Sequence, residues 1–225
     1  MVSTIAQTID RQHVGVTAFN NELEKRDISA WKVDSAYEDQ LEAALKEVVP
    51  AITVIRKPYS SNEFAPVNQH SEFLSKPAFG PNWSAIKDAV SRYCGNGQLD
   101  GVLMVARSTA PDFLGGTNQS LTGIGIYTRG PGTRVSMLYA IAVVGLIDCT
   151  SATPIAIRQL AKRQKGWPGE VARASAVEQL DSNLARTPIS DWTHATENTL
   201  RSYLINLPKT AWIATVRSMF ATEAN

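Results

Sequence analysis

Four segments rich in β-branched and apolar residues fill the middle of the chain and constrain its fold more than any other feature. They are residues 99–106, 121–129, 134–148 and 153–162. Short turns join the last three, as in an antiparallel meander. Segment 134–148 is long for one strand, so we expect a bulge or bend near Gly145.

The first half of the chain alternates between strand and helix. After a strand close to the N-terminus, we expect a helix over 35–49, which opens with the capping pattern of Ser35 and Glu38, and a strand over 51–57. Apolar spacing predicts a second helix over 82–94 and a helical C-terminal segment over 191–220 that Pro208 interrupts. The sequence thus predicts an α/β fold with a single mixed sheet, parallel in its first half and an antiparallel meander in its second, covered by helices.

Length and composition fit one globular domain. The 225 residues are 44% hydrophobic and 19% charged, with a formal net charge of +1. We expect a single domain over 1–225, with a sheet-forming core at 1–165 and a helical segment at 166–225 packed on it. The charge balance lacks the excess of basic residues that nucleic-acid binding needs, and no apolar run is long enough for a transmembrane segment. We expect neither a nucleic-acid partner nor a membrane span.

The N-terminal residues and the two cysteines bear on the compartment of the protein. The first residues, MVSTIAQTI, have no signal-peptide pattern, so we expect any native export signal to lie outside this sequence. Cys94 and Cys149 are either two buried thiols or a disulfide, and a bridge requires an oxidising compartment.

The strand ending in Leu146-Ile147-Asp148, its polar turn and its return strand resemble a hairpin of bacterial cell-envelope domains. These domains are of the curli-secretion CsgG-like and penicillin-binding-protein-activator kind. The stretches HVGVTAFNN (13–21) and LGGTNQSLTGIGIYTR (114–129) also resemble a group of uncharacterised proteobacterial envelope proteins. This resemblance covers about residues 1–165, and it implies a non-catalytic module of the periplasm or cell envelope.

Two further stretches are similar to sequence blocks of SGNH-type esterases. GGTNQ (115–119) resembles the block whose asparagine stabilises an oxyanion, here Asn118, and DWTH (191–194) resembles the block in which an aspartate orients a catalytic histidine, here Asp191 and His194. The family's Gly-Asp-Ser nucleophile turn has no counterpart, since Thr8–Arg11 stands in its place. The alternative interpretation is that Ser190 or Asp191 caps the final helix.

The remaining motifs predict no metal and no cofactor. His13 and His70 have no partner at metal-ligand spacing, and Gly123-Ile124-Gly125 lies inside a predicted strand, which does not suit a dinucleotide fingerprint.

The polar stretch 108–120 is the predicted binding loop, because it leaves the central strand where α/β proteins often bind ligands. Its candidate residues are Asp112, Phe113, Thr117, Asn118 and Gln119. The preferred function is a non-catalytic, envelope-associated binding domain that recognises a protein partner or small ligand through this loop, as a homo-oligomer. The alternative is an SGNH-like serine ester hydrolase acting on small esters, with Asn118, Asp191 and His194 as its catalytic residues.

Overall fold

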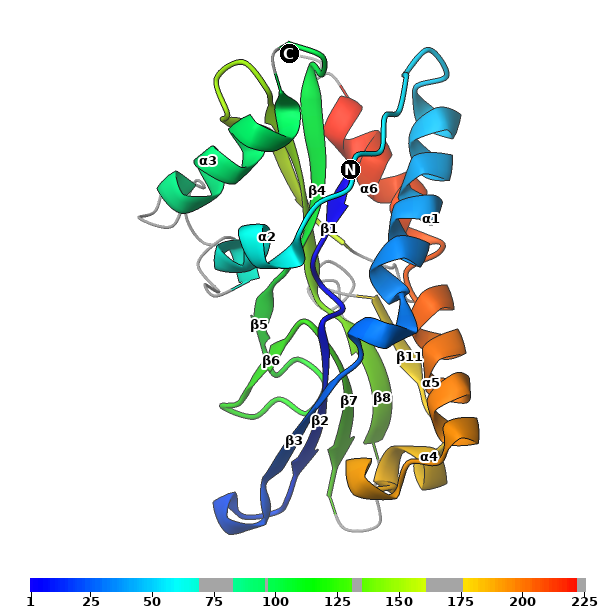
Figure 1. The fold of residues 1–225 in the computed structure, drawn as a ribbon. Helices are drawn as coiled ribbons and strands as arrows, with labels where there is room; N and C mark the ends of the chain where they lie inside the picture. The colour runs from blue at the N-terminus through cyan, green and yellow to red at the C-terminus, as the bar shows by residue number, and fades with distance from the viewer. Residues whose placement is uncertain (69–82, 96, 131–134, 161–175, 222–225) are drawn as a thin grey trace.

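The computed structural model describes residues 1–68, 83–95, 97–130, 135–160 and 176–221. The chain forms an elongated α/β structure in which two main sheets follow one another along the long axis (Figure 1). The mixed α/β class is therefore confirmed, but the prediction of a single sheet is wrong, because the strands divide into three sheets.

Sheet A, at the top of Figure 1, has the strand order β1-β4-β9-β10. β1 runs parallel to β4, and the other pairs are antiparallel. Its strands are β1 (Val2–Ser3), β4 (Gly101–Arg107), β9 (Ala142–Asp148) and β10 (Pro154–Gln159). β4 and β9 are almost wholly apolar because both of their faces are covered.

Sheet B has the order β11-β8-β7-β2-β3, in which β2 is parallel to β7 and the other pairs are antiparallel. Its strands are β2 (Thr8–Val14), β3 (Glu22–Asp27), β7 (Ile124–Arg129), β8 (Val135–Ala140) and β11 (Ala176–Gln179). The third sheet is the hairpin of β5 (Thr109–Pro111) and β6 (Ser120–Thr122), which packs on one face of sheet B.

The sheets separate at a junction of three residues, Ser108, Gly123 and Ile141, each of which lies between two strands of one continuous segment. Their backbones bond to one another: Ser108 N donates to the Ile141 carbonyl (3.0 Å), Gly123 N to that of Ser108 (2.9 Å), and Ile141 N to that of Gly123 (2.6 Å). Gly123 has φ +62°, a conformation that residues with a side chain rarely adopt. These bonds satisfy the backbone while the strands change direction.

The long segment 134–148 is accordingly broken, but not where the sequence suggested. β8 ends at Ala140 and β9 begins at Ala142, whereas Gly145 pairs regularly with Met104 inside sheet A. A register shift does occur nearby, on the neighbouring strand β10 between Pro154 and Ala156.

The predicted helices are confirmed within a few residues of their expected bounds. The helices are α1 (Val33–Val48), α2 (Ser61–Asn68), α3 (Trp83–Cys94), α4 (Ser182–Arg186), α5 (His194–Asn206) and α6 (Ala211–Phe220). Pro208 lies between α5 and α6, as expected. α2 and α3 cover one face of sheet A, while α1, α5 and α6 form a layer along the other side of the molecule (Figure 1).

Residues 51–57, by contrast, form no strand. Ile52 and Val54 pack against the main core, and Arg56 donates to Asp39 (2.6 Å) and Glu42 (2.7 Å) of α1. The segment is therefore held by side-chain contacts instead of a strand ladder.

The C-terminal segment contributes more than helices. β11 completes one edge of sheet B by pairing with β8, so residues after 165 are part of a sheet as well as of its covering layer. Residues 161–175, where the predicted division falls, lie outside the described residues.

The start of α1 also differs from the prediction. The capping box of Ser35 and Glu38 is not formed; α1 begins at Val33, and Glu38 instead accepts hydrogen bonds from Ser3 N (3.0 Å) and the Tyr59 hydroxyl (2.6 Å). Asp34 accepts from the Ser3 hydroxyl (2.7 Å) and two further donors, Ala6 N and Gln7 Nε2. The two carboxylates thus fasten the link between β1 and β2 onto α1.

A disulfide between Cys94 and Cys149 decides the alternative left open by the sequence. It joins the end of α3 to the turn that follows β9, beside a cluster that contains Tyr93 and Ile147.

Candidate functional site

A polar pocket of about 250 Å³ lies between the β2–β3 hairpin and the end of the β5–β6 hairpin. We call it the hairpin pocket. It is lined by Asp10, Gln12, His13, Asn21, Glu22, Leu23, Lys25, Gln119, Ser120 and Thr122. The pocket arises because the β5–β6 hairpin covers the centre of sheet B, whereas the Lys25 and Leu23 side chains on the edge strand β3 stay exposed.

Asp10 is the unusual residue of this pocket. Its side chain is only 6% exposed, and its two nearest cations lie beyond hydrogen-bond distance, with Lys25 Nζ 3.8 Å from Oδ2 and Arg107 Nη2 3.9 Å from Oδ1. Within the described residues, Oδ1 has no hydrogen-bond partner. Burial raises the pKa of Asp10, although Lys25 and Arg107 oppose the change.

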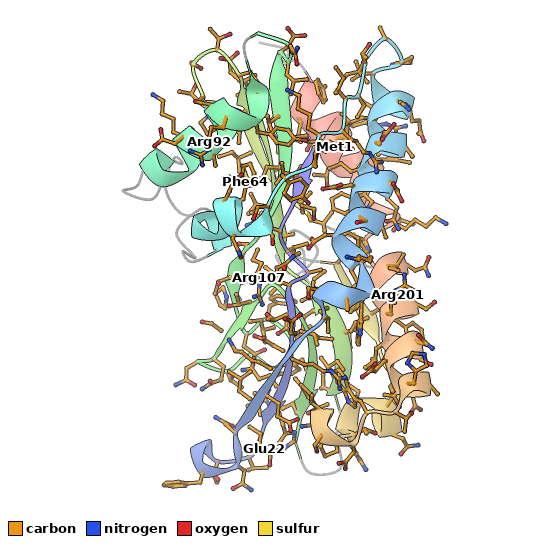
Figure 2. All side chains as sticks on the ribbon, viewed as in Figure 1. Met1, Glu22, Phe64, Arg92, Arg107 and Arg201 are labelled. Carbon is orange, nitrogen blue, oxygen red and sulfur yellow. A yellow bond between two sulfur atoms is a disulfide. The ribbon has the colours of Figure 1, made fainter. Side chains whose placement is uncertain are left out.

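Arg107 and Tyr139 lie near Asp10 but do not line the hairpin pocket. Arg107 Nη1 donates to the Thr8 hydroxyl (2.8 Å), which orients the guanidinium at the junction between the sheets, where Figure 2 labels this residue. Tyr139 is fully buried and lies so close to Gly125 that a Cβ there would be 2.3 Å from its hydroxyl oxygen. Burial, with the charge of Asp10, raises the pKa of Tyr139, so its hydroxyl stays protonated.

Arg11, the next residue along β2, shows what a fully structural buried charge looks like in this fold. It points to the opposite face of sheet B and donates to Glu24 (2.6 Å) and to the carbonyls of Ala185 (3.2 Å) and Arg186 (2.7 Å). All three side-chain nitrogens therefore have partners: Nη1 bonds to β3, and Nε and Nη2 hold α4. Asp10 has no comparable set of partners among the described residues.

The predicted binding loop is an ordered turn whose organiser is Asp112. This buried carboxylate accepts from Leu114 N (3.1 Å), Gly115 N (2.7 Å) and the Tyr127 hydroxyl (2.8 Å), and also from Thr117. Gly115 is needed for this packing, because a Cβ there would lie 2.0 Å from the Tyr127 hydroxyl. Asp112 and Thr117 thus shape the loop from within.

The other predicted loop residues differ in their surroundings. Phe113 is half-buried and packs on the cluster beneath the hairpin, whereas Asn118 is exposed and accepts from Gln119 Nε2 (3.3 Å). Gln119 is the predicted residue that lines the hairpin pocket.

The structure does not bring Asn118 together with Asp191 and His194. Asn118 lies on the β5–β6 hairpin, which packs on the Tyr127 face of sheet B, whereas the helix that His194 begins packs on the opposite face (Figure 1). Asp191 is exposed and accepts from the Ser190 hydroxyl (2.9 Å).

The cap of α5 is Thr193, whose hydroxyl accepts from Thr196 N (3.2 Å). Neither Ser190 nor Asp191 therefore takes the capping role that the sequence suggested.

Asp10 and Lys25 belong to no sequence motif, so motif patterns alone do not identify them. The signal was present: TIDRQHV, β2, carries polar side chains on both faces of a strand that lies between β7 and β3. Charges on both faces of an interior strand must be buried, and perturbed buried charges are concentrated at functional sites.

The described residues contain no group of three His, Cys, Asp or Glu side chains that could hold a metal ion. Within the same residues, no helix has the length and apolarity needed to cross a membrane. Comparison with protein-family models, with curated proteins and with solved structures finds no match for this chain. The envelope and esterase resemblances consequently stay predictions.

Proposed function

We propose that this chain is a non-catalytic binding domain that recognises a neutral polar group of a partner protein in the hairpin pocket. The observation that carries the proposal is the buried Asp10 carboxylate, which lines the pocket and whose Oδ1 atom has no hydrogen-bond partner in the described part of the chain. An unsatisfied buried polar group costs about 1–3 kcal/mol. Groups that cost stability in this way are typical of sites kept for function.

The chemistry of the lining favours a ligand that both donates and accepts hydrogen bonds. Asp10 offers an acceptor and Lys25 offers a donor 3.8 Å away. Around them lie amide and hydroxyl groups, from Gln12, Gln119 and Thr122 among others. A carboxamide or peptide group can donate to the carboxylate and accept from the ammonium at the same time.

The surface next to the pocket suits a protein partner. The β2–β3 hairpin extends to the bottom of the molecule, where Figure 2 labels Glu22, and its turn exposes Val16 (77%) and Phe19 (98%). Leu23, which lines the pocket, is 57% exposed. Exposed apolar groups beside a polar pocket are typical of protein recognition surfaces.

The disulfide between Cys94 and Cys149 supports placing this binding domain in the cell envelope, because disulfides persist in oxidising compartments. The homo-oligomer expected from the sequence stays a prediction.

The binding proposal is tested by a titration of the protein with N-acetyl-L-glutamine amide, followed in ¹H–¹⁵N NMR spectra. We expect amide shifts in 9–12, 23–26 and 119–122. Binding should be at least about tenfold weaker in Lys25→Ala, because the ligand loses one hydrogen bond to a charged group. Lys46→Ala is the matched control, since Lys46 is exposed to a similar degree (57% against 60%) but pairs with Glu42. Shifts spread over the whole surface, or equal weakening in both variants, would contradict the proposal.

The esterase alternative has its own test. With Asn118 and His194 on opposite faces of sheet B, we expect no turnover of p-nitrophenyl acetate above that of the His194→Ala variant. Turnover by the wild type that His194→Ala abolishes would replace the binding proposal with the hydrolase.

A further inference from the structure

A second pocket, of about 450 Å³, lies between sheet A and the layer of α1 and α6. We call it the apolar pocket. Its walls come from α1, the segment after it, the residues just before β4 and the strands of sheet A: Leu45, Ile52, Val54, Leu99, Leu103 and Leu146. It shares no lining residue with the hairpin pocket.

The rim of the apolar pocket is apolar as well. Ile155 on β10 is 61% exposed, Ile55 is 44% exposed and Phe220 at the end of α6 is 37% exposed. These side chains come from three separate segments of the chain and line one opening. Large apolar side chains that stay in water around a concave apolar surface mark a site for an apolar ligand.

We propose that the apolar pocket binds the unbranched alkyl chain of a small neutral or cationic amphiphile. The volume lies in the range of small-molecule sites, which is about 300–1,000 Å³. A narrow, flexible chain can follow a space bounded by α1, α6 and the strands β4, β9 and β10, and it exchanges water contact for contact with the leucine and isoleucine walls.

Charge sets the preferred headgroup. Asp100 is the acidic residue among the lining residues, and it is exposed. The described lining contains no Lys or Arg side chain. Of the cations close in sequence to the rim, Arg56 pairs with Asp39 and Glu42, and Arg217 pairs with Glu47. Arg158 donates to the carbonyls of Ser218 and Ile157, and Lys57 donates to those of Tyr93 and Cys94. The α-ammonium of Met1 donates to the hydroxyl of Tyr93, which packs on the other face of sheet A. The Asp100 carboxylate would therefore repel an anionic headgroup, and no Lys or Arg side chain of the described lining would attract one.

Isothermal titration calorimetry with three amphiphiles of equal chain length tests this inference. The probes are decyl maltoside, decyltrimethylammonium and decanoate, each below its micelle concentration. We expect one molecule of decyl maltoside, or one of decyltrimethylammonium, to bind per chain. Decanoate should bind at least about fivefold more weakly than either, because its charge repels Asp100.

A pair of double variants then locates the site. Ile55→Asn/Ile155→Asn removes apolar rim surface and should weaken binding about tenfold. Val16→Asn/Phe19→Asn is the matched control, because it changes two exposed apolar side chains at the far hairpin (77% and 98%) that line neither pocket, and it should leave binding unchanged. Far-UV circular dichroism and the melting temperature check that both double variants fold.

Three results would overturn the inference: no saturable binding of decyl maltoside or decyltrimethylammonium, equal weakening in both double variants, or binding of decanoate as tight as that of the cation. None of them depends on the hairpin pocket, since the residues changed at the rim lie outside it.

Discussion

The guanidinium of Arg107 lies where any side chain at position 123 would have to be: a Cβ on Gly123 would be 2.3 Å from Arg107 Nε. The same guanidinium contacts Thr8 and lies 3.9 Å from Asp10. One glycine therefore makes possible both the junction between the sheets and the position of Arg107 beside Asp10.

Gly123→Ala should destabilise the protein by about 3 kcal/mol, because it adds a clash with Arg107 to the cost of a left-handed backbone, which is about 1–2 kcal/mol. Urea unfolding measures the change. Gly116→Ala is the control: Gly116 has a similar φ, +64°, but nothing within 4 Å of a Cβ, so we expect only the backbone cost. Equal losses in the two variants would show that Arg107 yields without cost.

Asp10→Asn should stabilise the protein at neutral pH relative to the wild type, and the gain should shrink as the pH falls. Burial raises the pKa of Asp10, so the folded protein binds this proton more tightly than the unfolded chain does. That contribution to stability is complete below the unfolded pKa and is lost as the pH rises through the folded pKa. Urea unfolding of both proteins between about pH 4 and pH 7 measures the difference; a difference that does not change with pH would contradict the expectation.

Replacing both cysteines, as Cys94→Ala/Cys149→Ala, should lower the free energy of unfolding by about 2–4 kcal/mol, since the bridge closes a separation of 55 residues in the unfolded chain. Guanidinium unfolding with and without dithiothreitol measures it. The reductant should weaken the wild type and leave the double variant unchanged. If the wild type is insensitive to the reductant, the bridge does not form in the protein.

Asp34→Ala should cost about 3 kcal/mol, because it leaves Ser3, Ala6 and Gln7 without the carboxylate that accepts from all three. Asp39→Ala, on the same helix, removes a carboxylate that is 69% exposed and pairs with Arg56, so its cost should stay below about 1 kcal/mol. Thermal unfolding monitored by circular dichroism compares the two. Similar costs would mean that the link between β1 and β2 does not depend on Asp34.

Local patterns were sufficient to predict most of the elements. Apolar spacing along 35–49 and 82–94 gave two helices close to α1 and α3, and Pro208 marked the break between α5 and α6. These predictions succeed because helix periodicity and the effect of proline act over a few neighbouring residues.

The candidate site was only partly accessible in this way. The loop 108–120 does reach a pocket, through Gln119, but Asp112 turned out to hold the loop together. Asp10 and Lys25 come from strands distant from the loop in sequence, and no local pattern states which residues will face one another across two hairpins.

The sequence by itself determined the class of the fold and the rough places of its helices and strands, because these depend on spacing and on turn residues. Tertiary structure alone decided that the strands divide at Ser108, Gly123 and Ile141, that Glu38 bonds to Ser3 instead of capping its helix, and that Cys94 meets Cys149. Each of these depends on contacts between residues far apart in the chain. Their free energy comes from packing and hydrogen bonds that exist only once the whole core has assembled.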